Sequence, residues 1–226
     1  MANTSAAPSV QLWRPASTLA SVREAPKFLP LPVPGLKKLF AQGLSRGVIA
    51  EVNGDRSSGR TSVCLHILAQ ATRRGEVCAV IDLYDSFHPA SAAALGARLQ
   101  QVLWVRCHGN AEHAMHAADL LLHAGGFGVV LLDICGASLR VLNRIPLSYW
   151  YRFQRAIENT PTILLVCAPV SQVRSSSSNK LQLKRKAVRW RGKAPFFVLH
   201  GIEIDAILHK TSTASSPEPL SIQSVA

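Results

Sequence analysis

Acidic residues are scarce in this sequence. Its 226 residues include 13 Asp and Glu against 25 Lys and Arg, which leaves a formal net charge of +12. A surface with such an excess attracts polyanions over long range, and nucleic acid is the commonest partner of this kind. The charge therefore predicts a nucleic-acid partner, with an acidic protein surface as the alternative.

Paired cysteines and long apolar runs are missing as well. The five cysteines stand singly among apolar neighbours, without a CxxC pair. This spacing argues against a disulfide framework or a zinc site and indicates reduced thiols. The most apolar runs, GVVLLDIC and TILLVCAPV, are too short to cross a bilayer, and the N-terminus lacks a secretory pattern. We therefore expect a cytosolic protein that makes no use of a membrane.

Apolar runs alternate with amphipathic stretches through most of the chain. This pattern is typical of an α/β fold with a mainly parallel central sheet flanked by helices. We place this core at residues 47–210. Residues 1–46 mix Pro, Ala and Ser with apolar anchors, which predicts an arm with a short helix. Residues 211–226 are polar, small and proline-containing, which predicts a disordered tail.

A phosphate-loop pattern lies in EVNGDRSSGRTS, residues 51–62. The spacing Gly54-x-x-x-x-Gly59-Arg60-Thr61 follows a β-branched run and opens a helix, where backbone N–H groups can surround a phosphate. Arg60 replaces the usual lysine and is not its equivalent, while Thr61 can still ligate magnesium. Alternatively, the loop survives because the turn itself needs glycines. The predicted loop residues are Gly54, Ser57, Ser58, Gly59, Arg60, Thr61 and Ser62.

The stretch from Gly47 to Gly96 resembles the first half of the ATPase core of the RecA-like recombinase family. The similarity includes the SSG of the loop and the IDxxxxxxP after the second strand. VVLLD, which ends at Asp133, is similar to the second acidic motif of the family, and the resemblance extends over roughly residues 35–205. It implies a RecA-like fold that binds ATP, with magnesium held at Thr61 and Asp133.

Several positions depart from the family pattern. The glutamate that activates water in the family falls on Tyr84, with Asp85 beside it as a displaced acid. The adenine-contacting acid falls on His88, and the stacking tyrosine falls on Ser91. The polar pair that senses the terminal phosphate reads Ala-Pro at 168–169. These changes favour a degenerate nucleotide site, with ATP binding either weakened or lost.

Short RecA relatives with eroded nucleotide motifs resemble the ImuA group, which accompanies error-prone polymerases in the bacterial SOS response. Recombinase paralogues are the competing parallel. Both imply an accessory role in DNA recombination or translesion synthesis, beside a polymerase subunit or a recombinase, with homo-oligomers left open. The alternative is an active DNA-dependent ATPase of the RecA type, in which Asp85 would be the catalytic base.

The segment SQVRSSSSNKLQLKRKAVRWRGK, residues 171–193, contains no acid. A flexible serine tract followed by cations suits contacts with the phosphates of DNA, single-stranded DNA above all, and Trp190 offers a stacking plane. A solvated charge run and an acidic protein partner are the alternatives. The predicted DNA-binding residues are Arg174, Lys180, Lys184, Arg185, Lys186, Arg189, Arg191 and Lys193.

Two further clusters receive structural interpretations. His113 and His116 share a helical face, but no cysteine or carboxylate at ligand spacing completes a metal site. The aromatic run YWYRF, residues 149–153, is expected to pack a helix onto the sheet, with a partner-facing patch as the alternative.

Overall fold

A computed structural model describes residues 27–31, 33–173, 177–193, 195–210 and 213–223 of the chain. In this part of the chain, nine strands form one sheet in the order β10-β9-β8-β3-β7-β6-β4-β5, with β11 also paired to β9. The strands of this sheet are β3 (Ile49–Gly54), β4 (Cys78–Asp82), β5 (Val102–Arg106), β6 (Val129–Asp133), β7 (Ile163–Ala168), β8 (Ser177–Lys193), β9 (Phe196–Lys210), β10 (Thr213–Ala214) and β11 (Glu218–Gln223).

The centre of the sheet is parallel, as the alternation of apolar runs predicts. Strands β3, β7, β6, β4 and β5 pair in parallel, and β8 joins β3 in parallel on the other side. Strands β9, β10 and β11 then pair antiparallel to their neighbours. The carboxyl ends of the central strands therefore meet at one edge, where open α/β sheets bind ligands.

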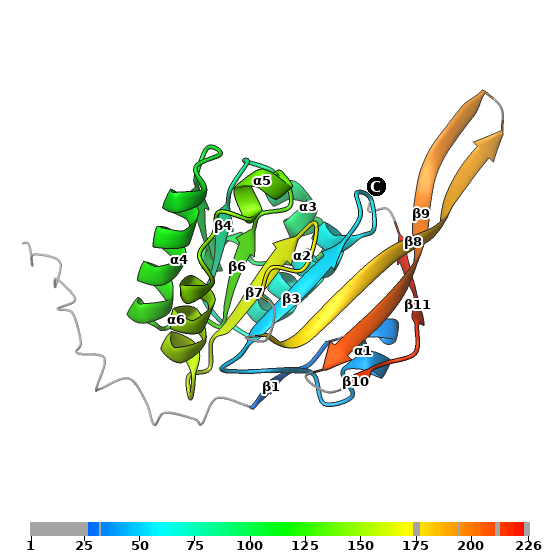
Figure 1. The fold of residues 1–226 in the computed structure, drawn as a ribbon. Coiled ribbons are helices and arrows are strands. Elements are labelled where there is room, and N and C mark those ends of the chain that lie inside the picture. Colours follow the sequence, from blue (N-terminus) through cyan, green and yellow to red (C-terminus); the bar gives the residue numbers. More distant parts are fainter. Residues whose placement is uncertain (1–26, 32, 174–176, 194, 211–212, 224–226) are drawn as a thin grey trace, which may run out of the picture.

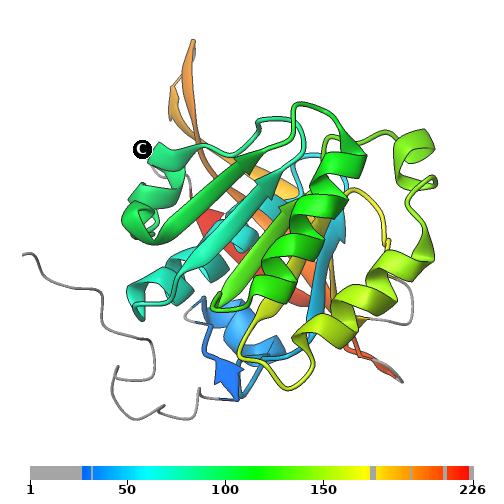
Figure 2. The same ribbon diagram turned by 90° about the vertical axis from the view of Figure 1, so that its left-hand side faces the viewer.

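Helices cover both faces of the sheet (Figures 1 and 2). The helices α1 (Pro34–Leu39), α2 (Arg60–Arg73) and α3 (Pro89–Ala94) contribute to one apolar core, and α4 (Ala111–Ala124) and α6 (Leu147–Ile157) contribute to the other. A 3-10 turn (Leu99–Gln101) precedes β5, and the short α5 (Leu139–Leu142) precedes α6. These layers confirm the predicted α/β class with helices on both sides. Within the described residues, no helix has the length and apolar content that a membrane crossing needs.

The segment before the core folds against it. A small two-stranded sheet joins β1 (Phe28–Leu29) to β2 (Leu44–Ser45), and α1 lies between them. Leu29, Leu36 and Phe40 are buried in the same core as α2. The apolar anchors of the arm therefore stabilise the domain in cis; residues 1–26 lie outside the described part.

Residues 177–193 of the serine-rich basic run form a strand rather than the flexible loop that the composition suggests, and residues 174–176 lie outside the described part. Ser177 already belongs to β8, which continues for 17 residues to Lys193 and pairs with β9 as a long hairpin. Residues 177–183 of β8 also pair with β3, which fixes this part of the strand in the sheet. Toward its tip the hairpin projects from the core (Figure 1). The positive charges of β8 therefore lie along a strand that begins in the sheet and ends on a projection.

The C-terminal segment also differs from the expected disordered tail. Its residues 218–223 form β11, which pairs antiparallel with residues 201–206 of β9. Leu220 is 3% exposed and contacts α1, where a Cβ on Gly35 would lie 1.9 Å from its Cδ2 atom. The prediction of a disordered tail was wrong for this segment, because its polar composition does not reveal that Leu220 is buried and that β9 has a free edge for β11 to pair with.

We expect Leu220→Ala to lower the free energy of unfolding by about 2–3 kcal/mol, because it leaves a cavity against α1. Urea denaturation measures this loss. The exposed neighbour gives the matched control, since Ser221→Ala should change stability by less than about 0.5 kcal/mol. Equal unfolding midpoints for the two variants would mean that the tail does not dock.

Candidate functional site

The turn between β3 and α2 has the backbone form of a phosphate cradle. A Cβ on Gly54 would lie 2.2 Å from the carbonyl oxygen of Leu183, so this close approach requires glycine. Gly59 is the N-cap of α2, with a left-handed φ of 85°. The first N–H groups of the 14-residue helix are therefore available to an anion. The structure brings the predicted loop residues together on this turn and the first helical turn: Gly54, Ser57, Ser58, Gly59, Arg60, Thr61 and Ser62.

Two hydroxyl groups of the loop fit a phosphate ligand with its metal. Ser58 is fully buried, and its Oγ has no hydrogen-bond partner among the described residues. Such a buried, unpaired donor is costly unless a ligand accepts from it. Thr61 is exposed at the start of α2. The turn itself therefore still fits a phosphate group.

Arg60 is turned into the protein. Its side chain is 8% exposed, and its Nη1 donates to the carbonyl oxygen of Ala168 at 2.8 Å. Ala168 ends β7, where the resemblance places the sensor of the terminal phosphate. The guanidinium therefore satisfies a backbone acceptor at the end of β7.

Carboxylates end the neighbouring strands β4 and β6. Asp82 is fully buried and accepts hydrogen bonds from the N–H groups of Ser86 at 3.0 Å and Phe87 at 2.8 Å. Asp133 accepts from the N–H of Cys135 at 3.0 Å and from the Ser86 hydroxyl at 3.3 Å. Burial raises the pKa of Asp133 above its ordinary value. Both side chains hold the turns that follow their strands.

The positions that would handle the base and the attacking water have other contacts. The ring of Tyr84 lies against the turns after β5 and β6, since a Cβ on Gly109 or Gly136 would approach it to 3.3 Å or 2.7 Å. His88 is the N-cap of α3. Its Nδ1 accepts from the N–H of Ser91 at 3.2 Å and lies 2.8 Å from the Ser91 hydroxyl. The residues at the expected adenine-binding positions therefore cap a helix.

Asp85 takes part in a surface ion-pair cluster at the ends of β4 and β5. Arg106 Nε donates to its Oδ1 at 2.9 Å, and His108 Nδ1 lies 2.9 Å from its Oδ2. The Arg106 guanidinium, and more weakly His108, hold the pKa of the Asp85 carboxyl below its usual range. A carboxylate with a lowered pKa is a poor general base, so this arrangement disfavours Asp85 as a replacement for the lost glutamate.

Known protein sequences show similarity to part of this chain. A family model described as the RecA N-terminal domain matches residues 37–142. This part of the chain is similar to the N-terminal domain of RecA. The chain is 36% identical to the protein RecA of Laribacter hongkongensis (strain HLHK9) over 95 residues, which make up 42% of this chain and 27% of that relative. The aligned stretch spans about a quarter of that relative. The residues that the family model matches include the phosphate loop, Tyr84 and Asp133.

Three cysteines of this RecA-like core converge beneath the loop, although they stand singly in the sequence. Cys135 Sγ lies 3.0 Å from Cys167 Sγ, and Cys64 on α2 is within hydrogen-bonding range of Cys167. The side chain of Asp133 borders the same cluster. Their spacing along the chain gives no signal, because β6 and β7 become neighbours only in the folded sheet.

A cavity of about 370 Å³ connects the phosphate turn with the root of the hairpin. Asn53, Gly54 and Asp55 line one side of it, and the segment after β7 lines another. The hairpin contributes the basic side chains that line the remaining wall: Lys180, Lys184 and His209. The nucleotide turn and the predicted DNA-binding strand therefore share one depression.

The β8 strand of the hairpin carries cations with few counterions. Lys186 lies 3.8 Å from Asp205, and Arg189 Nε donates to Glu203 at 2.7 Å. In the described part of the chain, the other predicted cations of β8 have no ion-pair partner; these are Lys180, Lys184, Arg185, Arg191 and Lys193. Arg174 lies outside the described residues. Five predicted cations thus remain available to an external anion.

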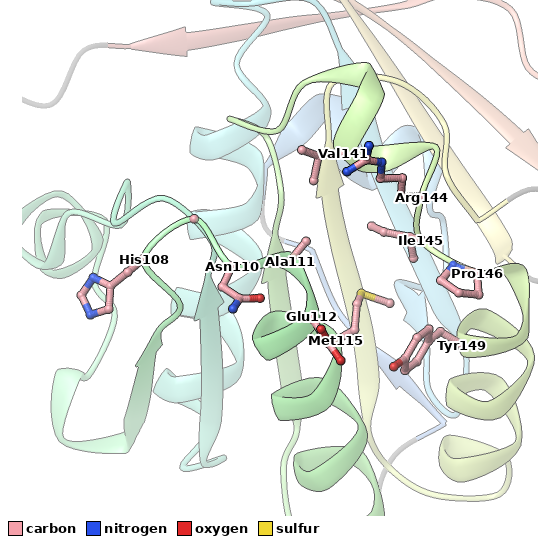
Figure 3. Close-up of a pocket in the computed structure, with 11 residues that line it drawn as sticks. His108, Asn110, Ala111, Glu112, Met115, Val141, Arg144, Ile145, Pro146 and Tyr149 are labelled. Atoms are coloured by element: carbon pink, nitrogen blue, oxygen red, sulfur yellow. The ribbon is translucent and has the colours of Figure 1, made fainter.

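A second depression lies away from the phosphate turn. It measures about 700 Å³ between α4 and the α5–α6 segment. Met115, Ile145 and Tyr149 face it, with Glu112 and Arg144 on its borders (Figure 3). The rest of the aromatic run divides between core and surface, since Trp150 and Phe153 are buried and Tyr151 is 56% exposed. The run therefore serves mainly to pack α6, as predicted.

The Asp85 cluster predicts a specific response to mutation. Arg106→Gln should raise the pKa of the Asp85 carboxyl toward its ordinary value, and His108→Gln should raise it less, because the guanidinium is the stronger influence. NMR titration of the Asp85 side chain measures both changes. Arg144→Gln removes a cation outside the cluster and should leave the titration unaltered. An Asp85 pKa that is insensitive to Arg106 would contradict the contact.

Proposed function

We propose that this RecA-like chain is an accessory protein of bacterial DNA repair that binds single-stranded DNA through its β8–β9 hairpin. The observation that carries this proposal is that five cations of strand β8 have no ion-pair partner among the described residues, from its root to its projecting end. Phosphate contacts of this kind give affinity without sequence preference. The net charge of +12 adds long-range attraction for the same partner.

Exposed aromatic groups favour a single strand over a closed duplex. Trp190 is 61% exposed, and Phe196 and Phe197 are 80% and 56% exposed. Unstacked bases can lie against such rings, and each stacked base contributes about 1–3 kcal/mol. The aromatic groups stand beside Arg191 and Lys193 on the same strands. Bases and phosphates of one strand can therefore be held together.

In this proposal the nucleotide site is degenerate and the protein is not an active recombinase. The phosphate turn persists, but Arg60 is bonded to Ala168 and Tyr84 stands where the catalytic glutamate is expected. Hydrolysis requires stabilisation of the terminal phosphate and a positioned water, and the two candidate groups, Arg60 and Asp85, are held by other parts of the protein. ATP with magnesium at Thr61 would therefore bind weakly, without turnover.

The place of the protein in repair follows from the same reasoning. An accessory without its own ATPase works through contacts, so we assign it to recombination or translesion synthesis beside a recombinase or an error-prone polymerase subunit. The resemblance of short, eroded RecA relatives to the ImuA group supports this assignment. The exposed tip of the hairpin and the α5–α6 surface are the faces that such a protein could contact.

Neutralising the hairpin should weaken DNA binding uniformly across sequences. For the triple variant Lys184→Gln, Arg185→Gln and Arg191→Gln, the slope of log K against log salt should fall by about 2, at roughly 0.7 per lost phosphate contact. Fluorescence anisotropy with labelled oligonucleotides across a salt series measures the slope.

The control removes the same charge elsewhere, through Lys37→Gln, Arg140→Gln and Arg155→Gln on exposed positions of helices. This variant should keep most of the salt slope. Equal weakening by the two triples would assign the binding to overall charge and would overturn the hairpin as the DNA site.

Mg-ATP should bind weakly and should not be hydrolysed above background, with or without single-stranded DNA. Calorimetric titration with Mg-ATP and a non-hydrolysable analogue measures the first point, and phosphate release measures the second. Turnover that Arg60→Ala and Asp85→Ala each abolish would replace this proposal with the active ATPase.

A further inference from the structure

The cysteine cluster beneath the phosphate turn contains side chains that can bind a metal ion. Ligand atoms of Asp133, Cys135 and Cys167 all lie within 4.8 Å of one another. They come from three rigid places, namely the end of β6, the turn after it and the end of β7. Asp133 and Cys167 are register partners in adjacent parallel strands, which fixes their spacing. The cluster is therefore held by the sheet itself.

The donor set suits a soft or borderline cation better than magnesium. Magnesium prefers six oxygen ligands in a near-octahedral arrangement, whereas thiolates select zinc and similar metals. The resemblance assigns the Asp133 carboxylate to magnesium, but two thiols lie beside it. These thiols therefore shift the metal preference of this edge of the sheet from magnesium toward zinc. Thr61 stays on the phosphate turn and is not part of the group.

Charge balance supports a divalent ion in this place. Two thiolates and one carboxylate carry three negative charges, which a divalent cation and the guanidinium of Arg60 would neutralise. Arg60 is close enough to act electrostatically on Cys135 and donates to Ala168, the residue after Cys167. A buried group of charges persists when it is neutral overall and well coordinated.

The geometry points to a zinc-type site formed by Asp133, Cys135 and Cys167, with the fourth position left to water. Tetrahedral zinc–sulfur bonds of about 2.3 Å separate two sulfurs by roughly 3.8 Å. The thiols stand 3.0 Å apart, so they must part by less than an ångström. Cys135 is partly exposed, which provides an entry path. This inference is independent of the proposed role in DNA repair.

Cobalt(II) provides the test, because thiolate-bound cobalt absorbs strongly by charge transfer. Titration of the reduced full-length chain should give this absorption with one equivalent of cobalt. Zinc should remove it by displacement, and a large excess of magnesium should not. Cys135→Ser should lose the absorption, whereas Cys78→Ser and Cys107→Ser, which change buried cysteines outside the cluster, should keep it.

A second readout covers the case in which a variant folds poorly. Zinc bound to the native state raises the unfolding temperature of the unmodified chain, and Asp133→Asn should reduce that shift. The inference is overturned if cobalt gives no thiolate absorption, if the absorption survives Cys135→Ser, or if it is lost equally in Cys78→Ser. If the Cys135 and Cys167 thiols oxidise and no metal is bound, the pair forms a disulfide, and this outcome also overturns the inference of a zinc site.

Discussion

The hydrogen bond from Arg60 to Ala168 constrains the whole carboxyl edge of the sheet. A guanidinium that is 8% exposed has lost most of its water and needs fixed acceptors. The carbonyl oxygen at the end of β7 supplies one at 2.8 Å. This contact ties the start of α2 to the strand beside β3, and it places a positive charge next to the cysteines. One side chain therefore links the phosphate turn to the cysteine cluster beneath it.

The positions that depart from the RecA pattern contact one another or nearby structural groups. Arg60 bonds to Ala168, His88 bonds to Ser91, and Asp85 is held by Arg106. Each contact gives a polar or charged side chain a partner within the protein. A fold can keep its phosphate turn under these conditions, because the turn also closes the β3–α2 connection. Retention of the turn and replacement of the residues around it are thus compatible in one structure.

Local sequence patterns predicted the strands, the helices and the phosphate turn, because each of these features depends on residues that are close in the sequence. The features that the sequence patterns did not predict depend on pairing between distant segments. Ser177 reads as part of a flexible tract but lies in a strand, since β3 offers a free edge to it. Leu220 orders a segment whose composition is polar, because it fills a site on α1. Cys135 and Cys167 are 32 residues apart in the chain, and only the β6–β7 pairing brings their sulfurs together.

The end of the hairpin has two different faces, and the pairing register defines them. Trp190 pairs with Leu199, and Gly192 pairs with Phe197, so these side chains share one apolar face. The intervening pairs join Arg191 to Val198 and Lys193 to Phe196, which puts the cations on the opposite face together with these two apolar side chains. Exposed apolar clusters of this kind are typical of binding surfaces. A strand of nucleic acid that crosses the tip of the hairpin could stack its bases on the apolar face while its phosphates contact the cations of the other face. A hairpin with only apolar or only basic side chains would not permit both contacts.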